Sequence, residues 1–240
     1  MSTHSNKTWS YGQAAAYLFL LLLVFFGVQL GAFLLLAGLS DSVAKLSLWA
    51  TLITAFFMMG LCFLLVRGLV KDDMARLLGR FHGDTLNAGL FWQGLGLLLL
   101  FFGLSEGLGR LLDKTPMDFM AEFIEGNPLW LVLFLTVIVA PVYEELLFRG
   151  VVFGLIAHAN PKKIHTAPSR RQLVLASVIS SVLFAVVHLQ YDWFGFGLIF
   201  LLALLFCYLR VRSGSLVLPI LFHMLNNAAA MAVYLFWGVS

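Results

Sequence analysis

Charged residues are scarce in this 240-residue chain. Aspartate, glutamate, lysine and arginine together make up 11% of it, whereas ordinary soluble domains contain about 25%. Hydrophobic residues make up 61% of the chain. So few polar residues cannot cover the surface of a water-soluble fold, and that class is excluded. The composition instead indicates a polytopic integral membrane protein.

Cysteine and internal repetition are also nearly absent. The chain has 2 cysteines, Cys62 and Cys207, each within a long apolar stretch and without the spacing of a disulfide framework or a thiolate metal site. A buried cysteine behaves as a small hydrophobic residue, so we expect both to be packing residues. We find no low-complexity tract and no repeat of the kind that marks many transporter folds.

Long apolar stretches, in contrast, are abundant. A helix needs about 17 to 25 apolar residues to cross the hydrocarbon core of a bilayer. Seven stretches meet this need, at about 13–39, 46–66, 87–105, 128–157, 172–190, 193–209 and 215–237. The sequence therefore predicts an all-α bundle of about seven transmembrane helices, with an uncleaved first span and no room for a folded extramembrane domain.

A short segment between the third and fourth stretches has the pattern of a further helix. Thr115 can cap its start, Pro116 suits its first turn and Gly126 suits its end. Its apolar and acidic residues fall on opposite faces: Phe119, Met120, Phe123 and Ile124 against Asp118, Glu122 and Glu125. We expect an amphipathic interfacial helix over 115–126, which either caps the bundle or covers a substrate entrance.

The distribution of basic residues predicts the orientation in the cell membrane, because cytoplasmic loops are enriched in lysine and arginine. With the amino terminus in the cytoplasm, the outer segments contain only Lys45, Arg110 and Lys114. The inner segments contain Lys7, Arg67, Lys71, Arg76, Arg80, Lys162, Lys163, Arg170, Arg171, Arg210 and Arg212. We therefore expect a cytoplasmic amino terminus and an external carboxyl terminus. The same bias accounts for the net charge of +3 without a nucleic-acid partner.

Three charged residues, Glu144, Glu145 and Arg149, lie inside the fourth stretch. A charge at the bilayer centre costs about 2.5 to 3.5 kcal/mol on insertion scales, so such residues normally line a site or pathway. Glu145 and Arg149 are four residues apart and are expected to form an internal ion pair. Glu144 is rotated by about 100° and stays free to react. Pro141 is expected to kink this helix and to free the carbonyl of Val137.

Two histidines and an amide lie within other stretches. His188 is in the fifth, and His223 is in the seventh with Asn227 four residues later on the same face. Phe184 shares a face with His188 in the same way. Together with Glu144 these groups can form a water-activating hydrolase site. Glu144 would act as general base, His188 would help hold the water, and His223 and Asn227 would donate hydrogen bonds to an oxyanion.

These residues resemble the three motifs of the CPBP family of intramembrane proteases, also called Abi, which includes the type II CAAX prenyl endopeptidases. The motifs are Glu144-Glu145-x-x-x-Arg149, Phe184-x-x-x-His188 and His223-x-x-x-Asn227. The resemblance covers about residues 128–230. It divides one integral membrane domain into 1–127, with three spans and the interfacial helix, and 128–240, the catalytic helix bundle.

The resemblance implies an all-helical bundle with a cavity open to the membrane and endopeptidase activity near the carboxyl terminus of a substrate. It implies Glu144 as the base with His188, and an oxyanion site at His223 and Asn227. Glu145 and Arg149 would support them. The expected partners are membrane lipid and peptide or lipidated-peptide substrates, and no nucleic acid.

The role of a metal stays open at this point. Glu144, His188 and His223 supply the two imidazoles and one carboxylate of a catalytic zinc site. The His-Glu-x-x-His helix of common zinc proteases is absent from the sequence. We therefore favour a glutamate mechanism without a cofactor, with zinc as the alternative.

Two other functions compete with proteolysis. A protein of this fold can serve as a binding or bacteriocin-immunity factor without turnover. Buried glutamate, arginine and histidine also form proton relays in proton-coupled transporters. The missing repeat symmetry and the gathering of polar groups in three helices argue against a transporter, and the complete motif set favours an enzyme.

Overall fold

The computed structural model describes residues 9–40, 42–70, 78, 87–114, 119–159 and 167–237. All regular secondary structure in these ranges is helical, which confirms the predicted all-α class. The separate helices are α1 (Tyr11–Leu36), α2 (Val43–Val70), α4 (Ala88–Leu112), α5 (Phe119–Glu125), α9 (Arg170–Val186), α10 (Trp193–Ser213) and α11 (Val217–Trp237). A composite helix with several segments lies between α5 and α9.

Each of the seven predicted stretches forms a helix, and six of these helices are long and apolar enough to cross a membrane. The exception is α9, with 17 residues. At about 1.5 Å per residue it extends about 25 Å, less than the hydrocarbon core of about 30 Å. The prediction that this span reaches residue 190 is wrong, because the chain leaves the helix after Val186.

The fourth span is a composite helix built of five segments. They are α6 (Leu129–Leu133), the π-helix η2 (Phe134–Val139), α7 (Ala140–Glu145), the π-helix η3 (Leu146–Val152) and α8 (Phe153–Ala157). A π-helix has i→i+5 hydrogen bonds, is rare, and occurs frequently at functional sites. The glutamate pair thus lies on α7, between two π-helices.

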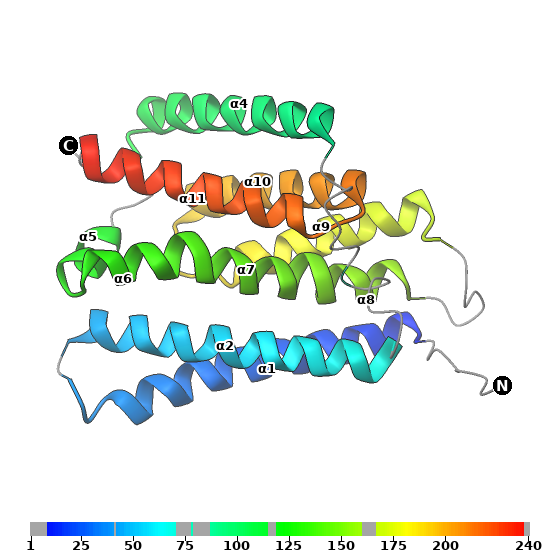
Figure 1. The fold of residues 1–240 in the computed structure, drawn as a ribbon, viewed down its shortest axis with the longest axis horizontal. Coiled ribbons are helices and arrows are strands. Elements are labelled where there is room, and N and C mark those ends of the chain that lie inside the picture. The colour runs from blue at the N-terminus through cyan, green and yellow to red at the C-terminus, as the bar shows by residue number, and fades with distance from the viewer. Residues whose placement is uncertain are drawn as a thin grey trace.

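The helices pack around this composite span. In Figure 1 the α1–α2 hairpin lies on one side of it and α4 on the other, with α9, α10 and α11 nearby. Contacts join η3 to α2, α9 and α10, and α11 to η2 and α7. Helix α4 approaches α10 and α11 closely at Gly94, where a Cβ would lie 2.9 Å from the Phe222 ring. Helix α1 begins at the end of the bundle opposite to that where α11 ends (Figure 1).

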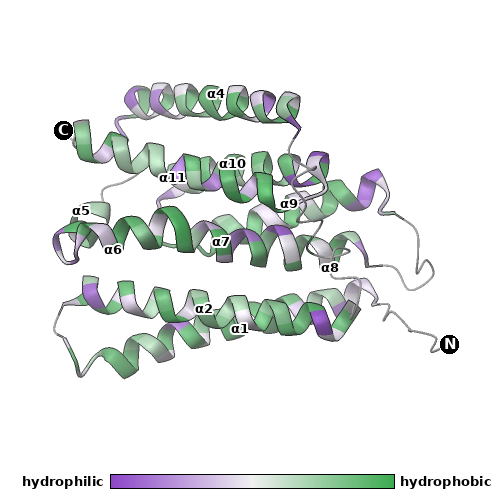
Figure 2. Cartoon of the chain, viewed as in Figure 1, coloured by the Kyte–Doolittle hydropathy of each residue, from purple (hydrophilic) through white to green (hydrophobic). Residues whose placement is uncertain are grey.

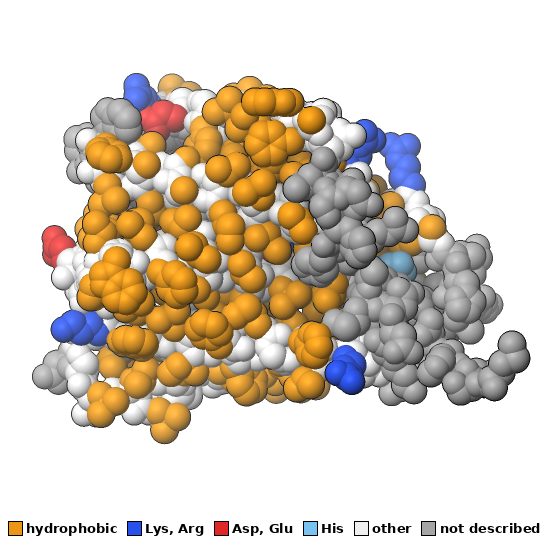
Figure 3. Space-filling view, viewed as in Figure 1, with side chains coloured by type: hydrophobic (Ala, Val, Ile, Leu, Met, Phe, Trp, Pro, Cys, Tyr) orange, Lys and Arg blue, Asp and Glu red, His pale blue; other side chains and the backbone are white. Residues whose placement is uncertain are grey.

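The surface fits a lipid environment. Hydrophobic residues dominate the long helices, and polar residues interrupt α7 in the interior (Figure 2). On the face shown in Figure 3, hydrophobic side chains cover the middle of the molecule and charged side chains lie toward its two ends. These views agree with a multi-pass membrane protein. The side of the membrane that each end faces stays a prediction.

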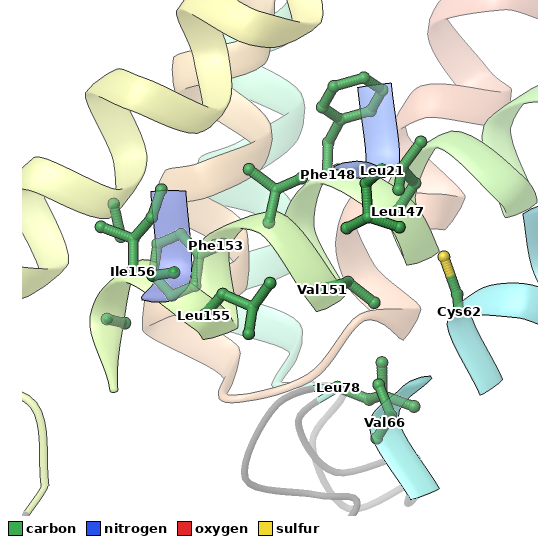
Figure 4. Packing of buried hydrophobic residues seen from close by; sticks show 14 of the residues in the cluster. Leu21, Cys62, Val66, Leu78, Leu147, Phe148, Val151, Phe153, Leu155 and Ile156 are labelled. Carbon is green, nitrogen blue, oxygen red and sulfur yellow. The ribbon is translucent and has the colours of Figure 1, made fainter. Parts of the chain in front are cut away.

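The main hydrophobic core joins the composite helix to its neighbours. Figure 4 shows residues of η3 and α8, among them Val151 and Leu155, facing Cys62 and Val66 of α2. Both cysteines are fully buried and form no disulfide, as expected of packing residues.

A second core cluster contains Met120 of the short helix α5, together with residues of α2 and of the composite helix. This packing favours the bundle-capping interpretation of α5. The predicted start of this helix at 115–118 lies outside the described residues.

Candidate functional site

The two adjacent glutamates have different surroundings. Glu145 is fully buried, and its Oε1 accepts hydrogen bonds from Arg149 Nη1 at 2.9 Å and from His223 Nδ1 at 2.9 Å. Glu144 is 12% exposed, and its Oε2 lies 3.7 Å from His223 Nε2. The predicted Glu145–Arg149 ion pair is therefore confirmed. The contact between Glu145 and His223 was not predicted, and it places the imidazole between the two carboxylates.

Aromatic rings and a backbone carbonyl surround the buried Arg149. Its guanidinium carbon lies 4.2 Å from the centroid of the Phe184 ring and 5.3 Å from that of Phe206. Its Nη2 donates to the carbonyl of Ala203 at 3.3 Å. Cation–π contacts of this kind strengthen where water is excluded. The arginine is thus held by Glu145, two ring faces and α10.

The same two rings also contact the histidines. Phe206 stacks on His223, with centroids 4.9 Å apart and planes at 27°. Phe184 lies 4.5 Å from the His188 ring and 5.8 Å from the His223 ring. Phe184 was predicted from its motif, whereas Phe206 was missed. Nothing in the apolar sequence of α10 distinguishes Phe206 from its neighbours.

His188 was predicted to lie within a span, and this is wrong: it lies in the turn after α9. Its Nδ1 lies 2.7 Å from the carbonyl of Phe184. Because a carbonyl only accepts, Nδ1 carries a proton, and in the neutral imidazole Nε2 then has the free lone pair. The bond uses a terminal carbonyl of the helix and explains why the helix stops there. His188 also lies within electrostatic range of Glu144.

Tyr191, in the same turn, is a further residue that the sequence did not single out. Its ring centroid lies 6.2 Å from that of His188. Burial, and then the Glu144 carboxylate, raise the pKa of Tyr191 to about 12. The phenol is therefore neutral at physiological pH and keeps its hydroxyl proton near Glu144.

Asn227 is tied to the composite helix rather than left free. Its Nδ2 donates to the backbone carbonyl of Thr136 at 2.8 Å, and its Oδ1 accepts from Asn226 Nδ2 at 3.0 Å. A carboxamide has two N–H groups, so one donor of Asn227 remains for another acceptor. Thr136 was missed because only its backbone takes part.

The carbonyls of the two π-helices connect the composite span to the motif helices. Ser180 of α9 donates to the carbonyl of Phe148 at 2.8 Å, and Arg210 Nε of α10 donates to that of Arg149 at 3.3 Å. Asn227 of α11 makes the third such bond, to Thr136. Each bond fixes the position of one helix along the composite span. Together they connect three helices to two different levels of the composite span, near Thr136 and near Phe148.

The predicted zinc ligands Glu144, His188 and His223 do not form a metal-binding group. In the described part of the chain, no three His, Cys, Asp or Glu side chains are placed to hold a metal ion. The Nδ1 atoms of both histidines are engaged by the Phe184 carbonyl and by Glu145, which leaves Nε2 as the second ring nitrogen of each. The mechanism proposed below uses no metal.

An apolar groove of about 700 Å³ lies between α11 and the first half of the composite helix. It is lined by Trp130, Leu133, Phe134, Val137, Ile138, Ala228, Met231, Ala232, Leu235 and Phe236. Val137 and Ala228 directly follow Thr136 and Asn227 in the sequence. The groove therefore runs beside the hydrogen bond that joins the two helices.

The fold and the site define a class, namely an integral membrane helix bundle that encloses two carboxylates, two imidazoles and an amide. Residues 126–229 match the family described as type II CAAX prenyl endopeptidase Rce1-like. This segment contains every motif residue, and the match confirms the resemblance predicted from the sequence. Over this segment, which is less than half of the chain, the sequence is similar to the CPBP family.

Three relatives are similar to this chain in sequence. An uncharacterized 24.3 kDa Escherichia coli protein is 30% identical over 146 residues, covering 59% of this chain and 63% of that protein. A Bacillus subtilis protein with the provisional name membrane peptidase YdiL is 24% identical over 72% of this chain and 68% of its own length. The membrane-embedded CAAX protease MroQ of Staphylococcus aureus is 33% identical over 40% of this chain and 36% of its own length. No solved structure matches the chain.

Proposed function

We propose that this protein is an intramembrane endopeptidase that hydrolyses membrane-associated or lipidated peptides with water activated by Glu144. The observation that carries the proposal is the position of His223 between two carboxylates with different surroundings. Glu145 is fully buried and bonded to Arg149 and to His223, while the Glu144 side chain is 12% exposed. Glu144 is the better exposed of the two glutamates, which supports its proposed role as the carboxylate that meets water and substrate.

Hydrolysis requires a base, an oxyanion donor and an acid. In the proposed reaction Glu144 takes a proton from water, and the hydroxide attacks the carbonyl carbon of the scissile peptide bond. The lone pair of His188 Nε2 helps hold that water. The tetrahedral oxyanion accepts hydrogen bonds from His223 and from the second N–H of Asn227. Glu144 then returns its proton to the amine as the C–N bond breaks.

The oxyanion role places a condition on His223. The short contact between its Nδ1 and Glu145 Oε1, an atom that already accepts from Arg149, requires a proton on Nδ1. A second proton on Nε2 is needed if this nitrogen is to donate to an oxyanion. We therefore infer that His223 acts as an imidazolium, with Glu145 on one side and Glu144 on the other.

The experiment is an activity assay of the purified protein in proteoliposomes, with quenched fluorescent peptides with and without a lipid anchor. Wild type should release fluorescence, and Glu144→Gln should lower kcat at least about 100-fold, in the range expected for loss of a general base. Glu106→Gln, at an exposed position of α4, is the control. No cleavage by wild type, together with a cellular phenotype that survives Glu144→Gln, would instead support the binding or immunity function.

A further inference from the structure

The helix hydrogen bonds around Pro141 leave one backbone carbonyl without its usual donor. In an α-helix Pro141 would free the carbonyl of Val137, as the sequence predicts. The structure differs because η2 is a π-helix, in which the N–H of Ala140 donates to the carbonyl of Leu135, five residues back. By the same spacing the partner of Pro141 is the carbonyl of Thr136, and proline has no N–H to give.

That carbonyl is the acceptor of the Asn227 side chain, whose Nδ2 lies 2.8 Å away. The Thr136 hydroxyl does not compete for the amide, because it donates to the carbonyl of Val132 at 2.9 Å. Asn226 completes the arrangement by donating to Asn227 Oδ1 at 3.0 Å. One N–H and one oxygen lone pair of the Asn227 carboxamide are then occupied, and these two bonds fix the orientation of the side chain.

We propose that Pro141 is a positioning residue for Asn227. By withholding a backbone N–H, it reserves the Thr136 carbonyl for the amide of α11. This aims the second N–H of Asn227 at the reacting carbonyl. The catalytic consequence rests on the proposed protease function, whereas the structural claim concerns only one hydrogen bond. Pro141 itself touches neither substrate nor water in this scheme.

The test replaces Pro141 by alanine, which supplies the missing N–H. In Pro141→Ala the new N–H competes for the Thr136 carbonyl and releases Asn227. We expect kcat to fall about tenfold or more with little change in KM, since small misplacements of catalytic groups cost up to about 100-fold. Asn227→Ala should lower kcat about 100- to 1,000-fold. The double variant should be no slower than Asn227→Ala alone, because Pro141 acts through Asn227.

Pro219→Ala is the matched control. Pro219 is the third residue of α11, and a first-turn N–H has no intrahelical acceptor, so adding one there should leave kcat unchanged. Alanine is the best helix former, so Pro141→Ala is expected to fold, and thermal unfolding checks this. A double variant that loses the full product of the two single effects would overturn the proposal.

A second readout does not depend on activity. The side-chain amide of Asn227, labelled with ¹⁵N and observed by NMR in nanodiscs, should exchange slowly with solvent in wild type and in Pro219→Ala. It should exchange faster in Pro141→Ala. An unchanged Asn227 signal in Pro141→Ala would refute the positioning role. If wild type shows no peptidase activity, the proposed function fails, and this measurement still decides the hydrogen-bond claim.

Discussion

Glutamine substitutions at the two adjacent glutamates should separate their roles. Glu145→Gln removes the charge opposite a fully buried Arg149, whose Nη1 lies 2.9 Å from Glu145 Oε1. Glu144→Gln removes a charge whose Oε2 lies 3.7 Å from His223 Nε2, which is longer than a hydrogen bond. We expect Glu145→Gln to cause the larger loss of stability. Glu144→Gln should chiefly abolish activity.

The magnitude follows from the burial of the pair. Removing one partner of a buried ion pair costs about 3 to 5 kcal/mol, because the other charge stays buried without compensation. Arg149 keeps its contacts with Phe184 and with the Ala203 carbonyl, so we expect a value near the lower end. For a chain of this size about 3 kcal/mol corresponds to a fall in Tm of about 6 to 12 °C.

The assay is thermal unfolding in nanodiscs, followed by tryptophan fluorescence, beside the peptide-cleavage assay. The control is Glu106→Gln, since Glu106 and Arg110 have the same i,i+4 spacing and a 2.8 Å contact but are 63% and 80% exposed. Exposed pairs of this kind contribute at most about 1 kcal/mol, so its Tm should change little. The reasoning is refuted if Glu144→Gln lowers Tm as much as Glu145→Gln does.

Three further outcomes are expected. Exhaustive chelation should leave peptidase activity intact, and a loss restored by zinc alone would contradict the glutamate mechanism. Gly94→Val should lower Tm by overpacking the contact between α4 and an aromatic ring of α11, while Gly96→Val, with open space around it, should lower Tm less. A backbone hydrogen bond from Gly195 and the Lys114 ammonium lower the pKa of Asp192. This contribution to stability is present above pH 3.8, the ordinary pKa of that carboxyl, and is lost as pH falls through the lower folded pKa. Asp192→Asn should remove the part of the fall in Tm at low pH that this carboxyl causes, and thermal unfolding at a series of pH values measures it.

Much of the fold was predictable because the bilayer imposes a length and a polarity on every span. The apolar stretches locate the helices, and the i,i+4 rule identifies the Glu145–Arg149 pair. The fifth helix was predicted too long because hydropathy does not register where an imidazole bonds a helix carbonyl. Val187 and Leu189 flank His188, so the sequence stays largely apolar past the true end of the helix at Val186.

The π-helices could not be predicted from the sequence. A proline indicates a missing backbone donor. It does not indicate whether the helix hydrogen bonds around it join residues four or five positions apart. We infer that the carbonyl released here is that of Thr136 and not that of Val137, because the N–H of Ala140 bonds the carbonyl five residues back. Contacts made by backbone atoms leave no residue-type signal, which is why the partners of Ser180, Arg210 and Asn227 were missed.

The charges of the site explain why adjacent glutamates are not interchangeable. Helical spacing places Arg149 on the face of Glu145, so these two buried charges neutralise one another. Glu144 has no arginine on its own helix face, and its Oε2 lies 3.7 Å from His223 Nε2. In a site of low effective dielectric constant, moving the paired carboxylate from position 145 to position 144 would leave Arg149 buried without a counter-charge. Glu145 therefore stabilises the bundle, and Glu144 is the carboxylate proposed to react.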